Sequence, residues 1–326
     1  MWLLASLFDL ILRQAAAWEP LAEPRGPWAV GHRALAGPDG PLAVWYPVAP
    51  STPMAMRLYG RIFLGRTAVA STPVAPGRWP LAILSHGLRG SRFDLAWLAG
   101  SLAARGWVVV AGEHPGTARD GYEPARATRL AARAAQLTAI LDHLEAAGDW
   151  RLRLNFDRVL AIGHSAGGST ALAWAGAQVD ADLLQAYDPG QLSPPVAVVE
   201  PRLAAVVALA PGTGPVFAAS GLSGVQLPVL LISGTADRHT PEELCAGHYA
   251  AHLPNASWER LAGAGHYIFK PVCNLYGRLR VPNLCRDAAG VDRAAAHAQI
   301  EAWLHAFLAA HALGPSTDLA RGAHRG

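Results

Sequence analysis

The sequence of 326 residues is poor in charge, in lysine and in cysteine. Charged residues make up 16% of the chain and hydrophobic residues 52%, a balance that excludes an intrinsically disordered protein and favours a large folded core. Lys270 is the only lysine, and the arginines are scattered rather than clustered, which argues against a nucleic-acid-binding surface. No Cys-x-x-Cys pair suggests zinc, and His248 and His252 lack the glutamate that zinc-protease motifs place between them. We therefore expect no metal and no other cofactor.

The N-terminal segment, residues 1–27, begins with an apolar stretch that is too short to span a bilayer. It ends in three alanines, residues 15–17, which resemble a signal-peptide cleavage site, but no basic region precedes it and Asp9 and Arg13 interrupt it. The alternative is an amphipathic helix, which we favour and which could contact a membrane or lipid surface. Its apolar face would carry Leu3, Leu4, Leu7, Leu10 and Ile11.

Strand-like and helix-like segments alternate along most of the remaining chain. Apolar runs without polar alternation predict strands at 42–47, 80–85, 107–111, 158–162, 203–210, 228–233 and 257–261. Helical spacing predicts helices at 91–105, 126–147, 169–177 and 293–311. Buried strands separated by helices are typical of a mostly parallel sheet covered on both faces, so the fold class is α/β.

The predicted domain organisation is simple. We expect one α/β domain at residues 28–313 and a disordered tail at 314–326. Residues 179–202, rich in Asp and Pro, are expected to form an insertion, and residues 48–79 a long Pro-rich loop that could carry a short helix. In an open parallel sheet ligands bind beyond the carboxyl ends of the strands, so reactive residues should follow strands directly.

Residues 163–168 read Gly-His-Ser-Ala-Gly-Gly and follow the predicted strand at 158–162 directly. A Gly-x-Ser-x-Gly between a strand and a helix is the pattern of a nucleophile elbow, a turn so sharp that only small residues fit beside the exposed serine. Ser165 is therefore the candidate nucleophile. The alternative is a tight strand-to-helix turn without chemistry.

A serine hydroxyl needs a base within hydrogen-bonding reach, and the base needs an orienting acid. For a nucleophile elbow the expected chain order is serine, acid, histidine. Asp237 follows the predicted strand at 228–233, and His266 lies in a Gly-rich turn after the last strand. These two residues are the candidate acid and base.

Other residues near these turns compete for the same roles. Glu242 and Glu243 follow a Thr-Pro pair and are expected in the first turn of a helix, where acidic residues favour the helix dipole. His239 is close to Asp237 in sequence but does not follow the final strand. The turn at 211–214 contains no carboxylate.

An oxyanion intermediate needs two backbone N–H groups. One is predicted at Ala166, at the start of the elbow helix, where free N–H groups favour negative charge. The second is predicted at Leu88, in the turn after the strand at 80–85. His86, in the same turn, is expected to brace the loop, and the side chain of His164 is expected to point beneath the elbow.

Cys273 and Cys285 bracket a short loop that contains Pro and Arg, while Cys245 is expected to be a small buried helix residue. A bridge between Cys273 and Cys285 would stabilise the protein by roughly 3 kcal/mol on the chain-entropy model. Because disulfides persist mainly outside the cytosol, a bridge would favour a periplasmic or secreted protein.

These motifs resemble those of the α/β-hydrolase superfamily, and more narrowly the bacterial predicted dienelactone hydrolases and the platelet-activating factor acetylhydrolases. The resemblance implies the α/β-hydrolase fold, a Ser-Asp-His carboxylester hydrolase with an oxyanion donor at Leu88, and a C-terminal disulfide. Dienelactone hydrolases use a cysteine nucleophile where Ser165 stands, which argues against that substrate. The segments that carry the resemblance lie between Leu42 and Leu308: Leu84 to Ser91, Gly112 to Thr117, Gly163 to Gly168, Gly234 to Asp237, and Gly265-His266.

The leading functional hypothesis is hydrolysis of a small-molecule ester with a short acyl chain. A polyester or longer-chain lipid hydrolase is the alternative, and a cleft lined by Trp97, Tyr267 and Phe217 would favour it. A non-catalytic scaffold that binds a small molecule or a protein is the third possibility. The residues that line the acyl site are expected in the loops at 180–201 and 212–225, and the sequence does not predict the oligomeric state.

Overall fold

The computed structural model describes residues 25–53, 55–57, 61–64, 66–70, 72–127, 129–187 and 199–315. Its strands are β1 (Ala29–Leu35), β2 (Leu42–Val48), β3 (Ala55–Arg57), β4 (Arg66–Ala70), β5 (Trp79–Ser85), β6 (Val108–Ala111), β7 (Leu154–His164), β8 (Leu203–Leu209), β9 (Val229–Gly234) and β10 (Ala256–Leu261). Its helices are α2 (Ala96–Ala104), α3 (Leu130–Ala146), α4 (Gly148–Arg153), α5 (Ala166–Trp174), α6 (Ala181–Tyr187), α7 (Ala219–Ser223), α8 (Ala246–His252), α9 (Leu275–Arg280), α10 (Pro282–Cys285) and α11 (Arg293–Ala310). Three short 3-10 helices are η1 (Pro124–Arg126), η2 (Gly214–Val216) and η3 (His266–Phe269).

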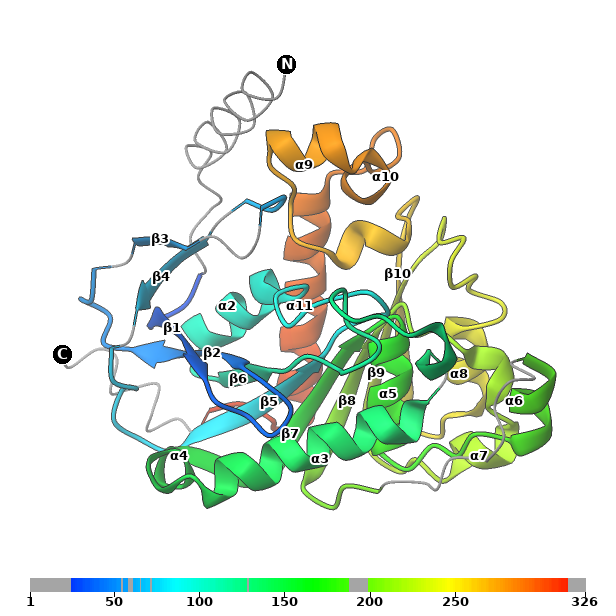
Figure 1. Ribbon diagram of the computed structural model, residues 1–326, viewed down its shortest axis with the longest axis horizontal. Coiled ribbons are helices and arrows are strands. Elements are labelled where there is room, and N and C mark those ends of the chain that lie inside the picture. Colours follow the sequence, from blue (N-terminus) through cyan, green and yellow to red (C-terminus); the bar gives the residue numbers. More distant parts are fainter. Residues whose placement is uncertain are drawn as a thin grey trace.

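The strands form one sheet in the order β10-β9-β8-β7-β5-β6-β2-β1-β4-β3. From β10 to β6 all neighbours pair in parallel, whereas β6 with β2, β2 with β1 and β4 with β3 pair antiparallel. The parallel strands therefore deliver their carboxyl ends to one edge, and β7 lies in the middle of that group (Figure 1). The predicted mostly parallel α/β architecture is confirmed.

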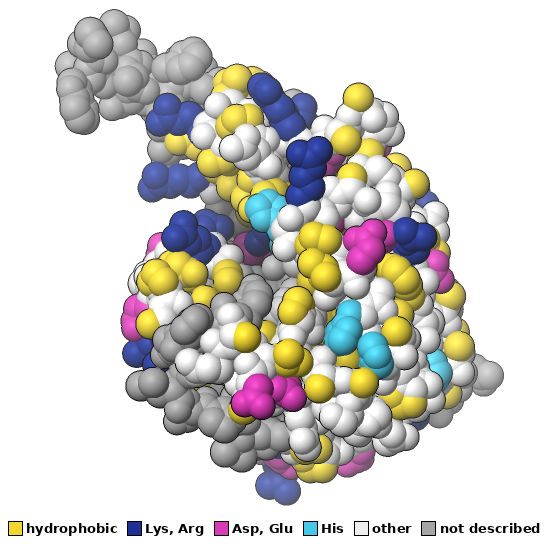
Figure 2. All heavy atoms as spheres, turned by 90° about the vertical axis from the view of Figure 1, so that its right-hand side faces the viewer, with side chains coloured by type: hydrophobic (Ala, Val, Ile, Leu, Met, Phe, Trp, Pro, Cys, Tyr) yellow, Lys and Arg dark blue, Asp and Glu magenta, His cyan; other side chains and the backbone are white. Residues whose placement is uncertain are grey.

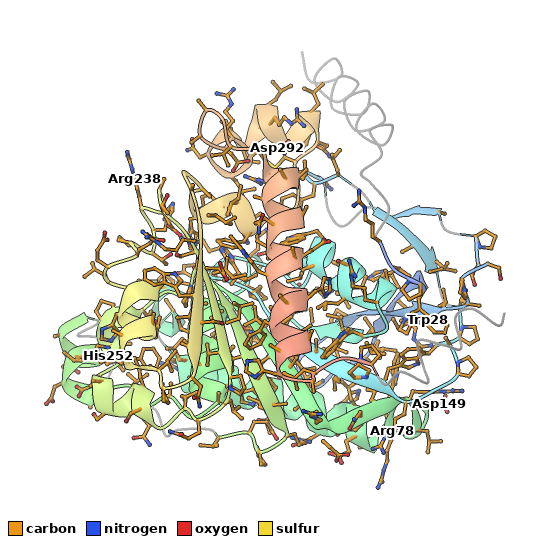
Figure 3. All side chains as sticks on the ribbon, turned by 180° about the vertical axis from the view of Figure 1, so that it is seen from behind. Trp28, Arg78, Asp149, Arg238, His252 and Asp292 are labelled. Carbon is orange, nitrogen blue, oxygen red and sulfur yellow. A yellow bond between two sulfur atoms is a disulfide. The ribbon has the colours of Figure 1, made fainter. Side chains whose placement is uncertain are left out.

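Helices cover both faces of this sheet, as fully apolar parallel strands require. One buried cluster joins the sheet to α3, α5 and α8, and a second joins the opposite face to α2 and α11. Seen from behind, α11 crosses the back of the sheet, beginning beside Asp292 (Figure 3). The Asp292 carboxylate accepts hydrogen bonds from the Ala294 and Ala295 amides and so caps this helix.

Several predicted boundaries differ from the observed ones. The helix predicted at 91–105 begins only at Ala96, because residues 91–95 form turns in which the Ser91 hydroxyl bonds Asp94. The helix predicted at 126–147 begins at Leu130, after the 3-10 turn η1. The elbow helix was expected from 169, yet α5 begins at Ala166, directly after Ser165.

The first half of the chain contains strands that the sequence patterns did not predict. β1 was missed because its half-exposed outer residues break the apolar run. The Pro-rich segment 48–79 contains β3 and β4, and its described residues form no helix. The described part of the 179–202 insertion carries α6. Residues 1–24 and 316–326, on which the N-terminal and most of the tail predictions fall, lie outside the described residues.

Candidate active site

Ser165 occupies the junction between β7 and α5 with φ 57° and ψ −125°, a left-handed backbone that non-glycine residues rarely adopt. The flanking glycines allow the chain to close around it. An added Cβ at Gly163 would lie 2.0 Å from the Gly167 carbonyl oxygen, and one at Gly167 would lie 2.0 Å from the Ser85 carbonyl oxygen. The segment therefore has the geometry of a nucleophile elbow.

His266 lies between the serine and an aspartate. Its Nε2 is 3.0 Å from Ser165 Oγ, and its Nδ1 is 2.7 Å from Asp237 Oδ2. A carboxylate can only accept, so Nδ1 carries the proton and Nε2 is left free to accept the serine proton. The structure thus brings together three predicted residues from the ends of three different elements.

Asp237 is buried, and all of its described contacts are donors to it. Its Oδ1 accepts the backbone N–H groups of His239 and Thr240, and its Oδ2 accepts the Thr240 hydroxyl as well as His266. Burial by itself raises the pKa of this carboxyl, but the hydrogen bonds and charge of His266 and the bonds from Thr240 outweigh it, so the pKa is lowered. The carboxylate is therefore ionised at neutral pH. Thr240 was not anticipated, although its position three residues after an aspartate is typical of a local turn bond.

The competing acids and bases have other partners. The prediction that Glu242 begins a helix was wrong, because α8 starts at Ala246 and Glu242 lies in the preceding turn. Its carboxylate pairs with Arg260 and accepts the Ser233 hydroxyl, which holds it away from the imidazole. The ring of His239 is exposed at the mouth of the site, with its centroid 5.1 Å from that of His266.

A cavity of about 360 Å³ opens above the serine, lined in part by Leu88 and Ala166. In the part of the chain that the structure describes, neither the Leu88 nor the Ala166 amide donates to a protein acceptor. Gly87 packs directly on the elbow, since a Cβ there would lie 3.1 Å from Ser165 Cβ. Both predicted oxyanion donors therefore border the cavity that holds the serine hydroxyl.

His86 and His164 are buried rather than reactive in this geometry. His86 Nε2 accepts the His114 amide, so its Nδ1 carries the proton and donates to the Gly87 carbonyl. Burial, with the nearby Arg133, lowers the pKa of His86 to about 3, and the ring is neutral. His164 borders the cavity beside His266, and its Nε2 lies 3.2 Å from the His266 carbonyl oxygen.

The aromatic cleft considered for a polyester hydrolase is not formed by the described residues. Trp97 is 1% exposed and bonds the Phe269 carbonyl, and Phe217 is fully buried. Only Tyr267 of the three borders the cavity. Of the two loops expected to form the acyl site, Gly212 and Thr213 of the second contribute to the lining.

Lys270 and Asp94 form a buried ion pair at one side of the cavity that sequence reasoning missed. Asp94 precedes α2 and Lys270 follows η3, so the pair ties the His266 segment to the segment behind the Leu88 loop. Burial opposes ionisation of Asp94, but the charge of Lys270 prevails and the pKa of that carboxyl is lowered. The sequence feature that could have drawn attention to this pair is that Lys270 is the only lysine of the chain.

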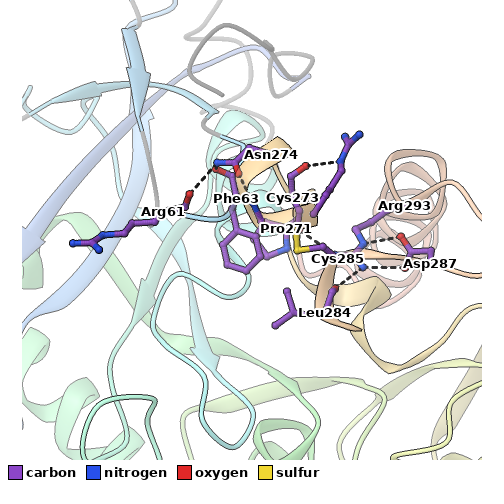
Figure 4. Close-up of a disulfide and its surroundings, with 11 residues drawn as sticks. Arg61, Phe63, Pro271, Cys273, Asn274, Leu284, Cys285, Asp287 and Arg293 are labelled. Carbon is purple, nitrogen blue, oxygen red and sulfur yellow. Dashed lines mark hydrogen bonds and ion pairs between the residues drawn. A yellow bond between two sulfur atoms is a disulfide. The ribbon is translucent and has the colours of Figure 1, made fainter. Parts of the chain in front are cut away.

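Cys273 and Cys285 form a disulfide that encloses α9 and α10 (Figure 4). This excursion projects from the sheet edge, and Leu284 within it borders the cavity. Basic side chains gather near the top of the face shown in Figure 2, and α9 ends with the exposed Arg278 and Arg280. Cys245 is buried and free, but it precedes α8 instead of lying within it.

The described residues contain no group of three or more His, Cys, Asp or Glu side chains arranged to hold a metal ion. Among them no helix has both the length and the apolar character needed to cross a membrane.

Residues 61–125 match the family model for platelet-activating factor acetylhydrolase, isoform II. The chain has the α/β-hydrolase fold. The matched segment includes β5, the loop with Leu88 and β6, but it ends before Ser165, Asp237 and His266. The match supports an esterase-type function at the level of the family. No curated protein matches the sequence.

Proposed function

We propose that the protein is a serine carboxylester hydrolase that acts on small esters with short acyl chains through an acyl-enzyme intermediate. The observation that carries this proposal is the continuous hydrogen-bonded chain from Ser165 through His266 to Asp237. Its serine end borders the cavity that Leu88 and Ala166 also line, and the amides of these two residues donate to no acceptor among the described residues. In this proposal Ser165 is the nucleophile, His266 the base and Asp237 the orienting acid, with Leu88 and Ala166 as oxyanion donors.

In the first half of the reaction, Ser165 Oγ attacks the acyl carbon while its proton passes to His266 Nε2, 3.0 Å away. The carbonyl oxygen becomes an oxyanion, which the Leu88 and Ala166 amides stabilise. The C–O bond to the alcohol then breaks, and the alkoxide takes the proton from His266 Nε2. The Asp237 carboxylate stabilises the imidazolium that exists between these two proton transfers.

In the second half, a water molecule replaces the alcohol. His266 Nε2 accepts a proton from the water as its oxygen attacks the acyl carbon of the ester formed on Ser165. The same amides hold the second oxyanion, and collapse of the intermediate returns the proton to Ser165 Oγ and releases the carboxylic acid. The proposed chemistry uses only side chains, backbone amides and water.

The size and lining of the cavity favour a short acyl group. Its volume of about 360 Å³ lies near the lower end of the range for small-molecule sites. The large aromatic side chains that would extend it for a polymer or a long chain, Trp97 and Phe217, are buried in the protein core. Leu88, Tyr267 and Leu284 are the larger apolar side chains that line it.

The test is a series of p-nitrophenyl esters from acetate to palmitate, measured with the wild type and with Ser165→Ala. We expect Ser165-dependent hydrolysis with kcat/KM highest for acetate or butyrate and falling steeply for longer chains. A fluorophosphonate probe should label the wild type at Ser165 and leave Ser165→Ala unlabelled. Hydrolysis that is unchanged in Ser165→Ala would overturn the proposal.

Two other outcomes lead to the alternative functions. A kcat/KM that rises beyond octanoate would replace the short-acyl substrate with a longer-chain lipid or polyester. Failure of the probe to label a folded wild-type protein would support a non-catalytic scaffold. A His266→Gln variant serves as the second control, since it keeps a polar side chain but removes the base.

A further inference from the structure

Arg133 is a buried cation that forms no ion pair with a carboxylate of the described residues. It lies in the first turn of α3, and only 2% of its surface is exposed. Among the described residues no carboxylate accepts a hydrogen bond from it. Its acceptors are instead neutral oxygens, those of Thr170 Oγ1 at 3.0 Å, Thr117 Oγ1 at 2.8 Å, Ser85 Oγ at 3.4 Å and the His86 carbonyl.

A guanidinium in such a place is costly. Removing a cation from water is unfavourable, and no carboxylate of the described residues pairs with Arg133 to offset this. Burial lowers the pKa of Arg133 to about 9, so the side chain is still charged at neutral pH. Its N–H groups donate hydrogen bonds to several segments next to the candidate oxyanion site.

The first of these segments is the loop that carries the Leu88 amide. Arg133 holds the His86 carbonyl, His86 Nδ1 in turn donates to the Gly87 carbonyl, and the Thr117 carbonyl accepts the Arg89 amide. Because a peptide unit is planar and trans, fixing the Gly87 carbonyl fixes the opposite direction of the Leu88 N–H. The loop is therefore held on both sides of its candidate donor.

The second segment is the elbow helix. Arg133 Nε donates to Thr170 Oγ1, and that hydroxyl donates to the Ala166 carbonyl one turn earlier. Ala166 supplies the other candidate oxyanion amide. One guanidinium thus connects through His86 to the carbonyl of the Gly87–Leu88 peptide and through Thr170 to the carbonyl of Ala166.

We propose that Arg133 is a positioning residue for the oxyanion hole, which sets the separation and direction of the Leu88 and Ala166 amides from below. This inference rests on the proposed function. The structure gives Arg133 no access to the cavity, so it acts through the loop and the helix and does not touch substrate.

The experiment compares Arg133→Met and Arg133→Lys with the wild type on p-nitrophenyl acetate. Loss of a single oxyanion donor costs about 100- to 1000-fold in kcat, so a displaced hole should lose part of that. We expect kcat to fall about 100-fold in Arg133→Met and about 10-fold in Arg133→Lys, with KM changed less than about twofold. If Arg133 had only a structural role, its replacement would lower the melting temperature without lowering kcat much more than it changes KM.

A second readout tests the hole itself. Ser165 Oγ adds reversibly to the carbonyl carbon of a trifluoromethyl ketone inhibitor. The carbonyl oxygen of the inhibitor then becomes an oxyanion that lies in the oxyanion hole. The inhibition constant of this ketone should rise by the same factor as kcat/KM falls. The matched control is Thr138→Val on the same helix, whose hydroxyl bonds Trp174 and Glu200 away from the site. This variant should be less stable than the wild type but should keep the wild-type kcat/KM and inhibition constant.

The outcomes separate this inference from the proposed function. If the wild type shows no Ser165-dependent hydrolysis, the proposed function fails. If it does, and a folded Arg133→Lys or Arg133→Met keeps wild-type kcat and inhibition, the positioning role is overturned. Should neither variant fold, Thr170→Val decides, because it removes the link to Ala166 alone. A fall of about 5- to 10-fold in its kcat supports the role, and an unchanged kcat overturns it.

Discussion

Replacing Asp237 with asparagine probes the candidate acid with little change in shape. Asp237 Oδ1 accepts two backbone N–H groups, from His239 at 2.8 Å and Thr240 at 2.9 Å, and an amide oxygen can keep both. The amide nitrogen must then replace Oδ2, which faces His266 Nδ1 at 2.7 Å. An N–H there donates to Nδ1 and moves the imidazole proton to Nε2, where it blocks acceptance of the serine proton. Turning the amide over instead would sacrifice both backbone bonds.

We therefore expect Asp237→Asn to lower kcat for p-nitrophenyl acetate about 10⁴-fold, which corresponds to about 5.5 kcal/mol. Thermal unfolding should remain cooperative, because the backbone bonds survive. The matched control is Glu242→Gln, the nearest rival carboxylate, which should keep kcat within about threefold although its pairing with Arg260 weakens. An Asp237→Asn enzyme with more than about a tenth of wild-type kcat, or an equal loss in Glu242→Gln, would refute the assignment of the acid.

Three further predictions concern the framework of the site. Gly163→Ala should destabilise the fold by at least about 3 kcal/mol in urea unfolding, since its Cβ would meet a carbonyl oxygen of the elbow, whereas Gly148→Ala, in open space, should change little. Cys273→Ser should lower stability by roughly 3 kcal/mol, and reductant should then have no further effect on the variant's melting temperature. Asp94→Asn should cost about 3–5 kcal/mol at pH 7, because it leaves Lys270 buried and unpaired. The pKa of Asp94 is lowered in the folded protein, so the unfolded chain binds its proton first and this stabilisation should disappear as the pH falls below about 4.

The parallel half of the sheet could be predicted from the sequence because its strands are buried on both faces. β5, β6, β8, β9 and the second half of β7, residues 159–162, read as apolar runs, which follow from helices on either side. Reactive residues directly after such runs belong at one edge of the sheet, and Ser165, Asp237 and His266 do meet there. The candidate triad could therefore be predicted mainly from the order of its residues in the chain and from their positions directly after strands.

The antiparallel half could not be predicted in the same way. β1 contains His32 and Arg33 at half-exposed positions, so its pattern matches neither a buried run nor a clean alternation. β3 and β4 are short and lie in a Pro-rich segment whose composition is typical of a loop. β1 is stabilised by pairing with β2 and β4, and β3 by pairing with β4, and local patterns do not report such pairing.

Arg133 is a buried charged residue within the apolar pattern that predicts α3, and its position in that pattern could have drawn attention to it. Arg133 lies three residues after Leu130 and four before Leu137, so it falls on the apolar face that predicts how α3 packs. A charged residue on that face is rarely left buried unless its donors are satisfied, and here every acceptor is neutral. An arginine that interrupts the buried stripe of a helix next to a nucleophile elbow is thus itself a sequence signal. In the structure its guanidinium donates to the His86 carbonyl and the Thr170 hydroxyl, the contacts on which the proposed positioning role rests.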